Sequence, residues 1–295
     1  TMKRTVITNA HVISPGVDLK GATVVIEGRK IKLVTADKVA VKADRDTTVV
    51  DVRGQYLMPG FIDVHTHGAL GWDFCDSDEK AIFEFAKAKL EEGVTTVLPT
   101  TLTVSNRELM TAAKNARKYA DAGMPYAKVP GIHLEGPFIN VKCCGAQNPK
   151  YVRKPDIKEV KAIAKVYPVK LISYAVEAEG GARFAKDCIK AGVVPSCGHT
   201  GAKMKDLMPA YKNGLRHMTH FCNQMTPLHH REIGMVGEED EIVLKGEYSH
   251  RWRRRGGASG DGYQACGGGR RYGAPCAFRV HSSGRTRERC CAAII

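Results

Sequence analysis

Short apolar segments alternate with amphipathic segments of helical length beyond residue 60, and this alternation most constrains the fold of the 295-residue chain. The apolar segments predict strands at 61–65, 95–99, 131–135, 170–175, 193–197 and 217–221. Helical spacing of apolar residues over 78–92 and capping-box spacing at 105–108 and 156–159 predict intervening helices. Strands that alternate with helices form parallel βα units, so we expect an α/β fold with about six units.

The first 58 residues follow a different pattern. Apolar segments at 5–7, 22–27, 30–34 and 48–52 are separated by turns that contain Gly or Pro, which predicts a small β unit. The chain therefore divides into a β portion (1–58), a region of βα units (59–248) and a segment without strand or helix periodicity (249–295).

Polar residues that bind metals follow several of the predicted strands. They are His65 and His67 on the first strand, Glu135 on the third, His199 after the fifth, and His220 on the sixth. A doubly wound sheet and a (β/α)8 barrel both contain βα units. The barrel assembles its active site at the carboxyl ends of its strands, so these positions favour the barrel.

Each of these residues has an ordinary interpretation when it is taken alone. A His-x-His pair is common by chance, a Glu at a strand end is often a solvated acid, and a lone His is often a core residue. Together they form a nitrogen- and oxygen-rich set suited to Zn²⁺ or Fe²⁺. Such an ion lowers the pKa of a coordinated water to about 7, which suits attack on a carbonyl carbon.

Five motifs resemble one family in the same order along residues 1 to 248. They are PGFIDVHTHG (59–68), HLEGPFIN (133–140), GAQNP (145–149), GHTGA (198–202) and THFCNQMTPLHHREIGMVG (219–237). In these stretches the chain resembles the amidohydrolase superfamily and, within it, the N-acetylglucosamine-6-phosphate deacetylase family. The resemblance implies a metal-dependent (β/α)8 barrel, a flanking β-sandwich and a homodimer. It also implies hydrolysis of N-acetyl-D-glucosamine 6-phosphate, a phosphorylated amino sugar, to D-glucosamine 6-phosphate and acetate.

The resemblance also assigns roles to individual residues. Glu135, His199 and His220 match the principal metal ligands, and His65 and His67 match a pair that holds a second metal in some members. We therefore expect one or two divalent metals per chain. The positions that match substrate contacts are Ala146, Gln147, Asn223, Gln224 and the phosphate-binding Arg231.

The resemblance stops at residue 248. Residues 249–295 contain neither the Ala-Asp-Gly-x-His motif of the family's seventh strand nor the Thr-Asp motif of its eighth. The Asp of that last motif is the family's general acid and base, and the setting of Asp261 does not match it, so no catalytic residue is assigned. We expect a barrel that is incomplete in its last two units, of low stability and with impaired turnover.

The same segment accounts for much of the formal net charge of +14, because it holds ten Arg and no Lys against Asp261 and Glu288. One interpretation is a nucleic-acid-binding tail in which aromatic residues stack on bases. The other is translation in a shifted reading frame, which produces Lys-free basic sequence rich in Gly and Cys. The absence of Arg-Gly-Gly repeats favours the second interpretation, so nucleic acid is not expected as a partner.

The remaining features restrict the class of protein. No run of about 18 apolar residues and no signal-like start occurs, which predicts a cytoplasmic protein without a membrane partner. Two alternatives stay open: another amidohydrolase, such as a cyclic amidase or a deaminase, and a non-catalytic barrel with a basic tail. Glu177, at a position where two-metal cyclic amidases carry a carbamylated Lys, argues against the cyclic amidases.

Overall fold

The computed structural model describes residues 3–227 except 38 and 41, together with 229, 234–235 and 245–246. Arg231 and the segment beyond residue 248 lie outside the described residues. The described chain forms two compact units, one up to Phe61 with Leu90–Thr95, and one from Ile62 to Lys89 and from Thr96 onward.

The first unit is a five-stranded mixed sheet with the order β3-β2-β1-β4, in which β5 also pairs with β1. Its strands are β1 (Arg4–Ser14), β2 (Val17–Glu27), β3 (Lys30–Thr35), β4 (Thr47–Asp51) and β5 (Tyr56–Leu57). Antiparallel hairpins join β1 to β2 and β2 to β3, whereas β4 and β5 run parallel to β1. Apolar residues such as Ile7 and Val24 form its buried cluster. The predicted β unit is therefore present in the form of one sheet.

The second unit contains a seven-stranded sheet with the order β14-β13-β12-β11-β10-β9-β6. Its strands are β6 (Phe61–Thr66), β9 (Val94–Thr101), β10 (Ile132–Glu135), β11 (Val169–Tyr174), β12 (Val194–Cys197), β13 (His217–Met218) and β14 (Lys245–Gly246). The pairs from β9 to β14 are parallel. The strands follow one another in chain order, without the reversal that defines a doubly wound sheet. This order fits the predicted TIM-type barrel.

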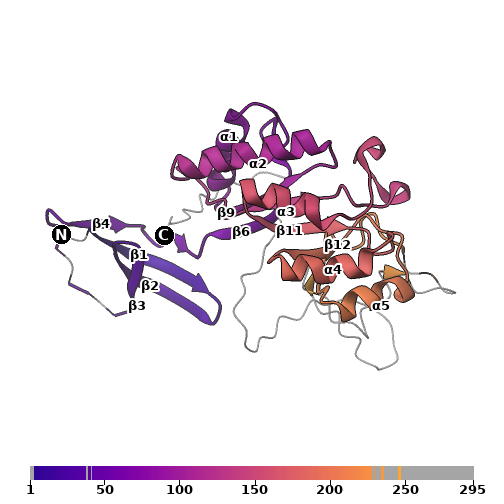
Figure 1. The fold of residues 1–295 in the computed structure, drawn as a ribbon. Helices are drawn as coiled ribbons and strands as arrows, with labels where there is room; N and C mark the ends of the chain where they lie inside the picture. Colours follow the sequence, from indigo (N-terminus) through magenta and orange to yellow (C-terminus); the bar gives the residue numbers. More distant parts are fainter. Residues whose placement is uncertain are drawn as a thin grey trace, which may run out of the picture. The chain divides into compact units, whose positions relative to one another are not determined.

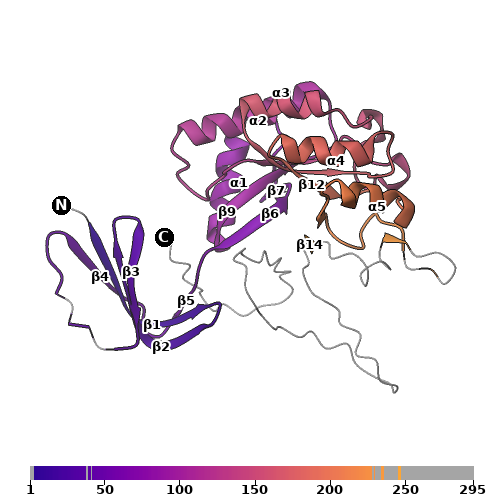
Figure 2. The ribbon, with the colours of Figure 1, turned by 60° about the horizontal axis from the view of Figure 1, so that its bottom comes forward.

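Helices cover one side of this sheet (Figures 1 and 2). They are α1 (Lys80–Glu91), α2 (Asn106–Asp121), α3 (Ile157–Val166), α4 (Gly181–Lys190) and α5 (Met204–Lys212). Consecutive helices from α2 to α5 contact one another, as they do in the outer ring of a barrel. None of the helices in the described part of the chain is long and apolar enough to span a membrane.

The two predicted capping boxes have different outcomes. Ser105 accepts a hydrogen bond from the Glu108 N–H, and the Glu108 carboxylate accepts one from the Ser105 N–H, so the box at α2 is confirmed. At α3, Asp156 caps the helix, but the Glu159 carboxylate binds the Arg153 guanidinium instead of the cap. The Arg153 guanidinium therefore binds the Glu159 carboxylate, which the capping-box pattern had assigned to the Asp156 N–H.

The sixth predicted strand is shorter than its sequence pattern indicates. The prediction covers 217–221, whereas β13 ends at Met218 and the chain then turns. The reason lies in the backbone of His220, whose φ is 31° and therefore not extended. The structure also contains a strand that the sequence pattern did not predict. This strand is β14, which pairs with β13 through Lys245 and Gly246.

A pair of short strands lies close to the predicted histidine pair. The strands β7 (Gly68–Ala69) and β8 (Trp72–Asp73) form an antiparallel hairpin directly after His67. A side chain at Gly68 would overlap the Trp72 carbonyl, since its Cβ would lie 1.9 Å from that oxygen. Glycine at 68 therefore permits the tight hairpin that leaves the histidine strand.

Candidate metal centre

The five predicted metal ligands meet at the carboxyl ends of the parallel strands, within the second unit. His65 lies in β6, His67 directly follows it, and Glu135 is the last residue of β10. His199 and His220 lie in the turns after β12 and β13. Their ligand atoms form two groups that share Glu135, each with all atoms within 4.8 Å of one another. The sequence-predicted set is thus brought together.

The first group is the more buried triad, formed by Glu135, His199 and the half-buried His220. The Glu135 Oε1 atom lies 3.2 Å from His199 Nε2 and 2.9 Å from His220 Nε2. The two Nε2 atoms are 3.1 Å apart. Tetrahedral zinc with Zn–N bonds of about 2.0–2.1 Å places its ligand atoms about 3.3 Å from one another. The spacing of this triad therefore fits a tetrahedral cation that lacks one further ligand.

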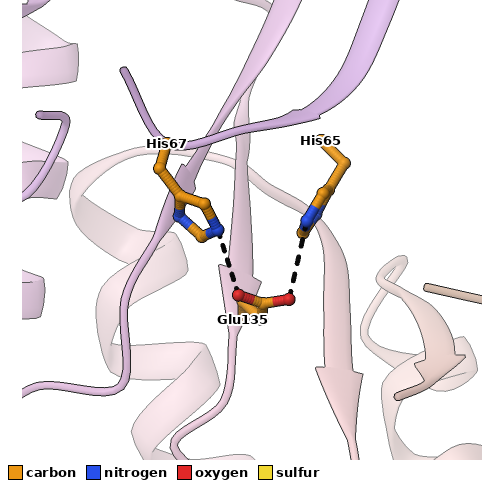
Figure 3. A group of neighbouring side chains, drawn as sticks. All are labelled: His65, His67 and Glu135. Carbon is orange, nitrogen blue, oxygen red and sulfur yellow. Dashed lines mark ion pairs between the residues drawn. The ribbon is translucent and has the colours of Figure 1, made fainter. Parts of the chain in front are cut away.

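The second group is a more exposed triad of His65, His67 and the same Glu135 (Figure 3). His67 Nε2 lies 3.1 Å from Glu135 Oε2, and His65 Nε2 lies 3.5 Å from Oε1. Both rings point at the carboxylate, as the two-residue periodicity of a strand predicts. The Oε1 atom therefore faces His65, His199 and His220, the Oε2 atom faces His67, and the two triads share this one carboxylate.

Backbone carbonyls orient two of the imidazole rings. His199 Nδ1 lies 2.8 Å from the Cys143 carbonyl, and His67 Nδ1 lies 3.1 Å from the Thr100 carbonyl. A carbonyl oxygen only accepts, so each Nδ1 carries the proton and donates it. In the neutral ring Nε2 then has the lone pair that binds a metal, which is the usual outer-shell arrangement of histidine ligands.

The electrostatics of Glu135 suit an ionised carboxylate in a buried place. Burial alone would raise its pKa, but the hydrogen bonds from His199, His220 and His67 hold the pKa well below its usual range. For His67, burial works to lower the pKa, but the hydrogen bond and charge of Glu135, the Thr100 carbonyl and the charge of Asp73 together outweigh it, so that the pKa is raised. The site therefore carries a fixed negative charge surrounded by imidazoles.

The backbones of His199 and His220 are left-handed, with φ of 48° and 31°. Such values are uncommon for residues other than glycine and carry a conformational cost of order 1–3 kcal/mol each. The two side chains therefore do not follow from strand periodicity, and the surrounding loops must hold them in place.

The predicted substrate contacts are distributed unevenly around this centre. Ala146 and Asn223 are exposed, and the Gln224 side chain packs over Gly145, where an added Cβ would lie 3.1 Å from it. Gln147 is instead buried, and its Nε2 donates to Glu135 Oε2 at 2.5 Å. Its Oε1 accepts from the Thr103 N–H at 2.6 Å. In this structure Gln147 thus braces the shared carboxylate.

A chain of polar side chains, all buried except the half-buried His217, crosses the sheet beside the candidate metal centre, and the sequence analysis did not single it out. It runs from His133 to Ser173, Thr219, Ser196 and His217, with successive atoms 2.6, 2.5, 2.6 and 2.8 Å apart. Burial lowers the pKa of His217 to about 4. The signal that could have revealed the chain is the single Ser or Thr within otherwise apolar strands.

The sequence profile of the amidohydrolase family matches residues 56–244, which include all five predicted ligands. The chain therefore belongs to the amidohydrolase family. Among curated relatives, it is 30% identical to N-acetylglucosamine-6-phosphate deacetylase of Bacillus subtilis over 83% of this chain and 64% of that protein. It is 32% identical to N-acetylgalactosamine-6-phosphate deacetylase of Escherichia coli O157:H7 over 64% of this chain and 51% of that protein.

The chain is also similar to solved structures of N-acetylglucosamine-6-phosphate deacetylases. N-acetyl-D-glucosamine-6-phosphate deacetylase of Mycobacterium smegmatis, in a variant bound to N-acetyl-D-glucosamine 6-phosphate, aligns with a TM-score of 0.73 at 25% identity. The alignment covers 83% of this chain and 62% of that one. The Thermotoga maritima enzyme aligns with a TM-score of 0.69 at 30% identity, over 82% and 61% of the two chains. This chain spans less than two thirds of the length of these relatives.

Proposed function

We propose that the chain is a metal-dependent deacetylase of N-acetyl-D-glucosamine 6-phosphate that releases acetate and D-glucosamine 6-phosphate. The observation that carries the proposal is the arrangement of four imidazoles around the shared carboxylate of Glu135. The relatives named as deacetylases of phosphorylated amino sugars support the choice of reaction.

The cofactor proposed is Zn²⁺ or Fe²⁺, one or two ions per chain. Glu135, His199 and His220 would hold the first, and His65 and His67 would join Glu135 around the second. When bound, such an ion acts as a Lewis acid on the amide carbonyl and favours ionisation of water at neutral pH. The carbonyls of Thr100 and Cys143 keep the imidazoles in the tautomer that such an ion requires.

The substrate side of the proposal rests on the loops around the centre. Asn223 and Gln224 lie in the turn that follows His220, and Ala146 lies in the loop after β10. We propose that these residues face the sugar and that Arg231 binds the phosphate, because a guanidinium fork matches a phosphate dianion. Gln147 would act on the sugar indirectly, through the orientation of Glu135.

The division of the chain completes the proposal. We propose a barrel over 59–248 that is incomplete in its last two units, and a β-sandwich portion over 1–58. Exposed apolar residues of its sheet, such as Ile31 and Leu33, support a sandwich, because they offer a surface for a second layer.

We further propose a homodimer in the cytoplasm, and an out-of-frame origin for 249–295. Reading the encoding DNA in its other two frames tests that origin. The idea fails if neither frame restores an Ala-Asp-Gly-x-His motif and a Thr-Asp motif.

Acetate release tests the proposed reaction. Metal-loaded protein is expected to release acetate from N-acetyl-D-glucosamine 6-phosphate slowly, since loss of general acid and base assistance costs about 10²- to 10⁴-fold. Chelator-treated protein is the control and is expected to release none. Faster release from the galactosamine epimer would move the proposal to the substrate named for the Escherichia coli relative. Absence of release from both, together with salt-sensitive binding of nucleic acid, would instead favour a non-catalytic binder.

A further inference from the structure

We propose that Glu177 is a positioning residue that holds the metal ligand His199 in its left-handed conformation. The proposal rests on the proposed function in one respect, which is that His199 binds a metal. Glu177 follows β11 and binds the loop that follows the neighbouring strand β12.

The Glu177 carboxylate accepts three hydrogen bonds from two other loops. Its Oε1 atom accepts from the Asn140 Nδ2 at 2.7 Å and from the Gly201 N–H at 2.6 Å. Its Oε2 atom accepts from the Thr200 hydroxyl. Bonds to an ionised acceptor are about twice as strong as neutral ones. The side chain thus joins the loops after β10 and β12 to its own.

Two of these partners lie directly beside His199 in the chain, and the third contacts it through space. Thr200 and Gly201 are the next residues, so the carboxylate restrains the turn that follows the ligand. The Asn140 N–H donates to the His199 carbonyl at 2.9 Å. The His199 ring in turn donates to the Cys143 carbonyl, in the 3₁₀ turn that Asn140 caps. His199 is therefore held from its ring, from its carbonyl and from the following turn.

The left-handed backbone of His199 is conformationally unfavourable, which explains why the hydrogen bonds of Glu177, here called the clamp, are needed. A left-handed non-glycine residue persists only where the surroundings determine it. Once the clamp is lost, the residue can relax to an extended backbone, which would move the ring away from Glu135. A glutamine at 177 replaces the carboxylate only in part, because its amide is neutral and its NH₂ group, set against the Thr200 hydroxyl, cannot accept the bond that this hydroxyl donates.

The test compares Glu177→Gln with Glu179→Gln in the full chain. Glu179 lies two residues away, is largely exposed and pairs with Lys154, so its variant removes the same charge from the same loop without touching His199. Titration with Zn²⁺ alone is expected to show affinity reduced about 10- to 100-fold in Glu177→Gln, the usual effect of losing an outer-shell partner. The affinity of Glu179→Gln is expected to stay within about twofold of wild type. Equal affinity of the two variants would overturn the proposal.

A second measurement tests the role of Glu177 independently of metal binding. In metal-free protein, hydrogen exchange at the Gly201 amide is expected to be faster in Glu177→Gln than in Glu179→Gln or wild type. Unchanged exchange would overturn the clamp even if metal binding changed. A wild-type chain that binds no Zn²⁺ would refute the proposed function, while the exchange comparison would still decide whether Glu177 holds this turn.

A milder variant covers the case in which Glu177→Gln does not fold. Thr200→Val keeps the side-chain shape and removes the hydroxyl that donates to Glu177 Oε2. It is expected to reduce Zn²⁺ affinity and to accelerate Gly201 exchange, in both cases less than Glu177→Gln. Thr200→Val with wild-type affinity and wild-type exchange would contradict the proposal.

Discussion

The two triads share one carboxylate but differ in how the protein holds their histidines. His199 and His220 have side chains that are 6% and 15% exposed, and both have left-handed backbones after strands that have already ended. His65 and His67 are 17% and 31% exposed and lie two residues apart at the end of one strand. Strand periodicity places His65 and His67 on one side of the strand, whereas loop contacts must aim His199 and His220.

This difference leads to unequal metal sites. Glu135 and His199 are buried, so a cation between Glu135, His199 and His220 would be less open to water and would exchange more slowly. A cation beside His65 and His67 would be open to solvent and would exchange more readily. Variants of the shared carboxylate and of the single histidines test this ranking.

Replacing Glu135 with Ala is expected to have the largest effect, because both triads lose the shared ligand. Metal affinity should fall by more than the roughly 10- to 100-fold seen when only an outer-shell group is lost. Metal analysis after dialysis measures the result, and acetate release should vanish with the metal. Glu84→Ala, at an exposed position of α1, is the matched control. Retention of wild-type metal content in Glu135→Ala would eliminate the shared-carboxylate arrangement.

Acidification is expected to weaken the polar chain beside both triads. Burial lowers the pKa of His217 to about 4 in the folded protein, whereas an unfolded His titrates near 6.5. The unfolded chain therefore binds the proton first as pH falls, so stability is lost between pH 6.5 and about 4, by up to about 3 kcal/mol.

Denaturant unfolding of metal-free protein across this range measures the loss. In His217→Gln the free energy of unfolding should depend less steeply on pH than in wild type, because the titrating group is gone. Parallel curves for the two proteins would show that His217 is not the group responsible.

Variants of single histidines compare the metal affinity of the two triads directly. His199→Ala is expected to lose about 10-fold more metal affinity than His67→Ala, because the buried ligand is held in place and the exposed one competes with water. Chelator-release kinetics provide the measurement. The rapid phase should disappear in His67→Ala and the slow phase in His199→Ala. The reverse assignment would invert the ranking of the two sites.

The capping box at α2 is expected to have the smallest effect and none on the metal. Ser105→Ala removes the N-cap hydrogen bond and should lower the free energy of unfolding by about 1 kcal/mol. Thermal unfolding measures the change, and metal affinity should match wild type. A change in affinity would mean that the centre responds to general stability, which would weaken the loop-based comparison of the triads.

Several parts of the fold could be predicted because they depend on neighbours along the chain. The alternation of strands and helices after residue 60 follows from local apolar periodicity, and the order of the strands in the sheet follows the chain. His65 and His67 face one carboxylate because strand geometry alone places residues two apart on one side. The capping box at Ser105 needs only four consecutive residues.

Other parts of the site could not be predicted because their partners lie far apart in the sequence. The motif around residue 147 suggested a substrate contact, whereas the fold brings Gln147 to Glu135 and to the Thr103 amide. Glu177 had no role in the sequence except as an argument against cyclic amidases. Its three donors come from loops that only the folded sheet places side by side.

The sequence by itself determined the candidate ligand types, the class of fold and the family, because these depend on residue identity and on short-range periodicity. Only the tertiary structure decided which side chains contact the candidate ligands and which triad is more buried. The physical reason is that a left-handed backbone such as that of His199 is unfavourable locally. Contacts across several loops select it, and those contacts exist only after the parallel strands have brought their carboxyl ends together.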